Sequence, residues 1–79
     1  MRRKTPDQLA READVLERGV RELGLPEEAL TSVLRVLDDF RRGVGYSGTL
    51  ALPGTGLALV AKLSLQPHIH SDVRLTKRG

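Results

Sequence analysis

Two histidines and an aspartate near the C-terminus have the side-chain types that suit a metal site. His68, His70 and Asp72 alternate with other residues, so they share one face if this segment is a β-strand. Such a row spreads the three side chains over more than about 12 Å, too wide for one tetrahedral ion unless the strand bulges or a second chain contributes. We expect no metal here. Solvent-facing polar residues are the main interpretation, and a pH-sensitive interface is a lesser one.

A turn-rich string lies in the middle of the chain. Residues 53–62 read Pro-Gly-Thr-Gly-Leu-Ala-Leu-Val-Ala-Lys, which resembles the phosphate loop of the AAA-type ATPases. That resemblance implies a nucleotide site. However, Leu57 stands where the phosphate-binding lysine belongs, Ala58 replaces the magnesium-binding hydroxyl, and Ala51 replaces the first glycine. The string therefore predicts a turn between two apolar runs, and no nucleotide cofactor.

A second glycine-rich segment, residues 43–48, has the spacing of the dinucleotide fingerprint. That fingerprint must follow a strand and open a helix, whereas this segment follows a predicted helix and precedes a predicted strand. We interpret it as a flexible connector whose glycines allow positive φ angles. Tyr46, within it, is a candidate contact for a partner.

The chain has few residues suited to nucleophilic or acid–base catalysis. The chain has no cysteine, and its helical carboxylates alternate with arginines, as in Asp14 with Arg18 and Glu17 with Arg21. Alternation of sign is typical of a solvated helical face rather than of paired catalytic carboxylates. We expect a protein that is not an enzyme and that has no small-molecule substrate.

The N-terminal part predicts two amphipathic helices. Thr5, Pro6 and Gln8 form a capping box with proline at the first helical position, so a helix is expected over about residues 6–23. Gly24 and Pro26 end it, and a second helix is expected over about residues 26–42. Because only two or three residues connect them, the helices should form an antiparallel hairpin. Their apolar stripes are Leu9, Ala13, Leu16, Val20 and Leu23, then Leu30, Val33, Leu34, Leu37 and Phe40.

After the connector the apolar period changes from helical to alternating. A β-element is expected over about residues 49–76, with Leu57, Leu59, Leu63 and Leu65 on one face. A third strand, containing His68 and His70, is less secure, and the basic tail 77–79 should fray. The predicted fold is α+β, with the helical hairpin packed on a small antiparallel β-hairpin or three-stranded meander, in one domain spanning residues 1–79.

Length and apolar pattern limit the protein class further. A chain of 79 residues builds only a small core, and without cysteine it has no disulfide to reinforce it. The basic N-terminus is not followed by an apolar signal region, and no apolar run approaches the roughly 20 residues of a membrane-spanning helix. We therefore expect a soluble cytoplasmic protein that does not bind membranes.

The net charge is +3, from 13 basic and 10 acidic residues, and the excess gathers in groups. If the fold joins two of these groups, a phosphate-binding patch results. The alternative function is therefore a nucleic-acid-binding regulator. Its candidate contacts are Arg2, Arg3, Lys4, Arg41, Arg42, Lys77 and Arg78.

Leucine is unusually abundant, with fourteen in 79 residues. This number exceeds what so small a fold readily buries, and exposed leucines would favour self-association or a docked partner. The leading hypothesis is a small protein-interaction module, a homodimer or a subunit of an assembly, that acts as an inhibitor or regulator by occluding or bridging a macromolecule. By analogy of size alone, accessory or anti-defence proteins of phages and mobile elements are the comparable class. The candidate binding residues are Arg41, Arg42, Tyr46, His68, His70 and Arg74.

Overall fold

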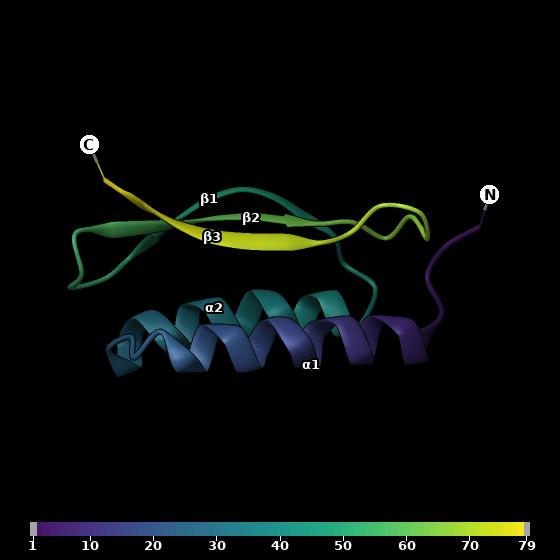
Figure 1. Ribbon diagram of the computed structural model, residues 1–79, viewed down its shortest axis with the longest axis horizontal. Coiled ribbons are helices and arrows are strands. Elements are labelled where there is room, and N and C mark those ends of the chain that lie inside the picture. The colour runs from purple at the N-terminus through teal and green to yellow at the C-terminus, as the bar shows by residue number, and fades with distance from the viewer. Residues whose placement is uncertain (1, 79) are drawn as a thin grey trace.

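The computed structural model describes residues 2–78, so Met1 and Gly79, the two ends of the expected domain, lie outside the described residues. Two helices are followed by a three-stranded antiparallel sheet (Figure 1), which confirms the predicted α+β class. The elements are α1 (Pro6–Glu22), α2 (Glu27–Arg41), β1 (Tyr46–Leu52), β2 (Leu57–Leu63) and β3 (Asp72–Lys77).

The first helix begins at the predicted capping box. The Thr5 backbone N–H donates to the Gln8 side-chain oxygen at 2.8 Å, and the Gln8 backbone N–H donates to the Thr5 hydroxyl at 3.2 Å. These two bonds satisfy donors that a helix N-terminus otherwise leaves unpaired. At the other end Gly24 takes a φ of +69°, which glycine adopts without steric cost and which turns the chain back toward α2.

The second helix differs slightly from its prediction. Pro26 precedes the helix instead of forming its first residue, and the helix begins at Glu27 and ends at Arg41. Glu27 and Glu28 lie in the first turn, where their charge is favourable beside the positive end of the helix dipole. The two helices lie side by side as the expected hairpin (Figure 1).

The sheet is a meander in the order β1-β2-β3. Its first strand starts earlier than predicted, because Tyr46, Ser47 and Gly48 pair with Leu63, Lys62 and Ala61. The expected connector 43–48 is therefore wrong in its second half. Gly48 has no positive φ and simply occupies a strand position opposite a buried alanine, so its presence did not mark a loop.

The third strand starts later than predicted, which corrects the row of His68, His70 and Asp72. Residues 66–69 form a turn, closed by the Ile69 backbone N–H donating to the Gln66 carbonyl at 3.1 Å, and β3 begins only at Asp72. Pro67 lacks an N–H and cannot contribute to a strand ladder on that side, which favours a turn. The two histidines therefore belong to the β2–β3 loop.

Both helices cover the same face of the sheet, and the opposite face is open (Figure 1). The core between the layers centres on Phe40, Leu37, Leu52, Leu59, Val20 and Val33, all fully buried. The surplus of leucine proves smaller than expected. Among the fourteen leucines only Leu23 is exposed, and the rest are buried or half-buried within the two layers.

Candidate protein-binding groove

The N-terminal segment is fastened across the end of the fold by Lys4. Its side chain is only 4% exposed, and its ammonium donates to the Glu12 carboxylate at 2.8 Å, the Ser64 carbonyl at 2.8 Å and the Ile69 carbonyl at 2.9 Å. The Lys4 backbone N–H also donates to the Leu65 carbonyl. Since three acceptors use all three ammonium protons, the buried charge is fully satisfied.

Glu12 connects the same cluster to the β2–β3 loop. Its carboxylate accepts from the Ser71 backbone N–H at 3.1 Å as well as from Lys4. Burial of the carboxylate acts to raise its pKa, but the hydrogen bonds from Lys4 and Ser71 and the Lys4 charge outweigh burial, so the Glu12 pKa is lowered. We call Lys4, Glu12 and Ser71 the polar clasp. It holds α1 and the β2–β3 loop together at this end of the molecule.

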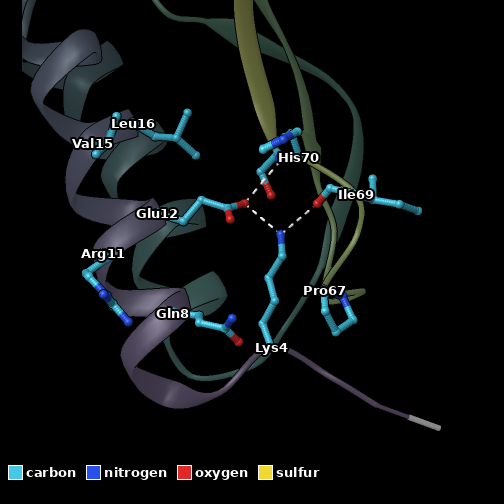
Figure 2. Close-up of a pocket in the computed structure, with 10 residues that line it drawn as sticks. Lys4, Gln8, Arg11, Glu12, Val15, Leu16, Pro67, Ile69 and His70 are labelled. Carbon is cyan, nitrogen blue, oxygen red and sulfur yellow. Dashed lines mark hydrogen bonds and ion pairs between the residues drawn. The ribbon is translucent and has the colours of Figure 1, made fainter.

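A groove begins at the polar clasp and runs between α1 and β3. Its first part is a cleft of about 540 Å³ bounded by the start of α1 and by Pro67, Ile69 and His70 of the loop (Figure 2). Its second part, of about 340 Å³, lies between the later turns of α1 and strand β3. The two parts adjoin at Val15 and Leu16, which line both, and we call them together the α1–β3 groove.

The second part of the groove is mainly apolar. Val15 is 65% exposed and Leu23 is 47% exposed, and between them Leu16 of α1 and Leu75 of β3 are only half-buried. Val15 and Leu23 are eight residues apart, so they lie two turns from each other on one flank of α1. Apolar side chains gathered in a hollow, rather than scattered singly, are typical of a surface that binds another protein.

Gly19 occupies the turn between Val15 and Leu23 and lines the same part of the groove. Glycine inside a helix is about 1 kcal/mol less favourable than alanine. Nothing in the fold requires it, because a Cβ built at Gly19 meets no atom within 4 Å. The missing side chain therefore makes the groove deeper without serving internal packing.

The charges on the groove are unbalanced. Arg11 lines the first part and forms no ion pair with an acidic side chain within residues 2–78. Arg74 borders the second part, but it alternates along β3 with Val73 and Leu75, which face the helices, so its side chain lies on the open face of the sheet. The one carboxylate that lines it, Glu12, is already paired with Lys4. The groove is thus an apolar hollow with one unpaired cation, Arg11, beside its first part.

Two residues of the expected nucleic-acid contacts are engaged inside the fold. Lys4 is buried in the polar clasp, which removes it from any exposed patch. Arg41 bonds the carboxylates of Asp14, Glu17 and Asp38 at 2.7–2.8 Å, joining the two helices. These bonds raise the pKa of Arg41 and lower that of Glu17.

The remaining basic groups are separated in space. Arg42 is exposed but contacts Asp39, while Arg2 and Arg3 lie near the N-terminal end and Lys77 and Arg78 near the C-terminal end. Those two ends of the chain lie at opposite ends of the 39 Å long axis (Figure 1). The fold therefore does not join the N-terminal and C-terminal groups into one patch.

The six residues expected to bind a partner are also dispersed. Tyr46 packs against the core, and His68 and His70 are exposed in the β2–β3 loop, away from the sheet face predicted for them. No hydrogen bond or ion pair joins any two of the six within the described range. Only Arg74 and His70 line the α1–β3 groove.

The residues that define the groove were not singled out from the sequence, although two signals were present. Val15 is apolar but lies off the stripe that contains Ala13 and Leu16, and an apolar residue outside the stripe indicates a second contact surface. Gly19 is the other signal, since glycine within a predicted helix needs a reason.

No protein-family model, curated protein or solved structure matches the chain. None of the described helices is long and apolar enough to cross a membrane, and residues 2–78 contain no cluster of three or more metal-binding side chains.

Proposed function

We propose that this chain is a non-enzymatic protein-interaction module that binds an amphipathic helix of a partner protein in the α1–β3 groove. The observation that carries the proposal is the exposure of Val15 and Leu23 on either side of Gly19, beside the half-buried Leu16 and Leu75. A partner that covers these side chains would remove apolar surface from water, which is the main driving force of protein association.

A helix suits the groove because of its spacing and depth. Val15, Gly19 and Leu23 repeat every four residues along α1, so they form a row that a second helix can follow. At Gly19 the absent side chain allows the backbone of the partner to approach closely. The partner helix would place its apolar row against Val15 and Leu23 and its backbone close to Gly19.

The unpaired cation Arg11 indicates the chemistry that flanks this apolar row. It would attract a carboxylate, so the partner helix should carry Asp or Glu beside one end of its apolar face. Such charges mainly raise the association rate and select the orientation, while the apolar contacts supply most of the affinity. Binding would occlude the partner helix, which is how a small inhibitor or regulator acts, including one of a phage or mobile element.

Binding of nucleic acid is the second function expected from the sequence, and it has less support. Of the seven cations expected to contact nucleic acid, Lys4 and Arg41 are held by carboxylates inside the fold and Arg42 is paired with Asp39 at the surface, which leaves Arg2, Arg3, Lys77 and Arg78 without a carboxylate partner in the described residues. A salt titration separates the two functions. Binding to DNA or RNA weakens steeply with salt, in proportion to the phosphates neutralised, whereas an apolar groove with one flanking cation should show a shallow dependence.

The decisive experiment is selection of binders from a displayed library of random helical peptides, followed by NMR mapping of the bound site. We expect enriched peptides to show apolar residues at helical spacing with neighbouring acidic residues, and to shift the resonances of Val15, Gly19 and Leu23. Enriched peptides that map to the open sheet face, or a library that yields no specific binder, would overturn the proposal.

Two matched variants sharpen the mapping. Val15→Glu should weaken the selected peptides by about tenfold or more, because a central apolar contact is typically worth over 1 kcal/mol. Val44→Glu is the control, since Val44 is a similarly exposed valine, at 55%, and does not line the groove. Equal losses in both variants would contradict the assignment of the groove.

A further inference from the structure

The two edges of the sheet differ in the way they are protected. Edge strands expose unpaired backbone N–H and C=O groups, and proteins usually guard them with charges, proline or a covering element. Strand β3 carries Asp72, Arg74 and Lys77. Strand β1, at the other edge, reads Tyr-Ser-Gly-Thr-Leu-Ala-Leu and contains neither a charged residue nor a proline.

We infer that a second copy of this chain pairs with β1, edge to edge and antiparallel, to form a dimer with a continuous six-stranded sheet. Within residues 2–78 no strand pairs with β1 on the side away from β2. Seven residues of uncharged strand therefore offer an unused hydrogen-bonding edge. A second β1 is a suitable occupant because it offers the same unused groups.

The sequence of β1 is complementary to itself in this arrangement. A two-fold axis at Thr49 places Thr49 opposite Thr49 of the second copy and Ser47 opposite Ala51, all small residues on the open face. On the face toward the helices it places Gly48 opposite Leu50 and Tyr46 opposite Leu52. Large side chains thus meet small ones at the centre, and no like charges face each other.

The charge pattern also selects a closed dimer over an open fibre. Pairing β1 of one copy with β3 of the next would continue without end, and it would bring Asp72, Arg74 and Lys77 against an uncharged strand with no opposite charges to meet them. Pairing β1 with β1 uses each unprotected edge once and leaves the charged β3 edges outermost, where they resist further addition.

The expected dimer is weak. Seven residues of strand extend roughly 24 Å, and such a contact with the adjoining flank of α2 lies at or below the lower limit of about 1,200 Å² for stable interfaces. Assembly should therefore depend on protein concentration over the micromolar range. This dimer does not depend on the proposed function, because β1 and the α1–β3 groove lie on opposite flanks of the molecule (Figure 1).

Sedimentation equilibrium from about 5 µM to 1 mM tests the inference over the range expected for a small interface. The wild-type protein should pass from monomer to dimer, and hydrogen–deuterium exchange should slow in β1 at high concentration but not in β3. A protein that remains monomeric throughout the range, or that forms species growing beyond a dimer, would overturn the inference.

Matched substitutions assign the dimer to one edge. Thr49→Lys places two lysines opposite each other at the two-fold axis and should raise the dimer dissociation constant at least tenfold, and Ala51→Lys provides a second test at the same edge. Thr76→Lys, an exposed threonine on the same sheet face of β3, is the control. Circular dichroism verifies folding of each variant. A dimer that survives both β1 variants contradicts the inference, while Val15→Glu should leave the dimer intact and affect peptide binding only.

Discussion

The two long flanks of the molecule leave different groups uncovered. On one flank α2 packs against β1, and Leu52 of that strand is fully buried, but the strand edge is uncharged and unpaired. On the other flank the edge of β3 is charged, but α1 leaves a groove beside it in which Val15 and Leu23 are exposed. The flank of α2 and β1 buries its apolar side chains but leaves a backbone edge unprotected. The flank of α1 and β3 protects its backbone edge with charges but leaves apolar side chains exposed.

This difference separates two kinds of binding energy within one small fold. An unpaired strand edge offers directional hydrogen bonds, which specify register and suit an identical strand. An apolar groove offers non-directional burial, which suits a helical row of side chains. A dimer formed through β1 would carry two α1–β3 grooves facing away from each other, as a protein that bridges two partner molecules requires.

The largest expected difference in stability is between two separate leucine-to-alanine variants, one on each flank. Leu52→Ala on the closed flank should lower the free energy of unfolding by about 3 kcal/mol, because it leaves a cavity in a fully buried site. Leu23→Ala on the open flank should lower it by less than about 1 kcal/mol, since nearly half of that side chain already contacts water. Urea denaturation of both variants measures the difference. Equal losses would show that the groove is filled in solution.

The next effect concerns the polar clasp that closes one end of the groove. Lys4→Met should lower the free energy of unfolding by about 3 kcal/mol, because it leaves the Glu12 carboxylate and two carbonyls without their donor. The control is Lys62→Met, at an exposed lysine of β2 without an ion pair among residues 2–78, where a change within about 0.5 kcal/mol is expected. Similar values for both lysines would show that the clasp contributes little to stability.

A smaller effect, of opposite sign, is expected at Gly19. Gly19→Ala should raise the free energy of unfolding by about 0.8 kcal/mol, because alanine is the better helix former and its Cβ has open space. The same variant should weaken binding of groove-selected peptides, whereas dimerisation should not change. A gain in stability without any loss of peptide binding would contradict the role given to Gly19.

The smallest effect is on acid stability. The pKa values of Glu12 and Glu17 are lowered in the folded protein, so both carboxylates stabilise the fold above their unfolded pKa of about 4.3, and this contribution disappears as the pH falls through their lower folded values. Thermal melting from pH 6 to pH 3 should show the decline. In the Lys4→Met variant the part of this decline that is due to Glu12 should disappear, and in Glu17→Gln the part that is due to Glu17 should disappear.

Local signals in the sequence were sufficient for most of the fold. The capping box at Thr5, the glycine at residue 24 and the alternation from Leu57 to Leu63 each act over a few residues, and each predicted its element correctly. The errors arose where neighbours in space decide. Gly48 lies in a strand because Ala61 pairs with it, and the histidines leave the strand because residues 66–69 turn toward Lys4.

The candidate site was much less predictable. From the sequence, Lys4 was one of three consecutive basic residues and a candidate nucleic-acid contact, and only the fold reveals that its acceptors lie 60 and 65 residues away. Arg41 looked free because its partners Asp14 and Glu17 belong to another helix. Pairing across large sequence separations depends on how elements pack, which residue spacing alone does not encode.

The polar clasp has a consequence for the order of events during synthesis. Lys4 leaves the ribosome before either helix, yet its carbonyl acceptors follow 60 and 65 residues later. At a rate of 5–20 residues per second, this interval lasts roughly 3 to 13 s. During this interval the helical hairpin can form, but Lys4 stays in water and the apolar faces of both helices remain exposed until the sheet forms. The nascent chain is therefore most exposed to chaperones and proteases at this stage, and its last folding step joins Lys4 to carbonyls made 60 and 65 residues later.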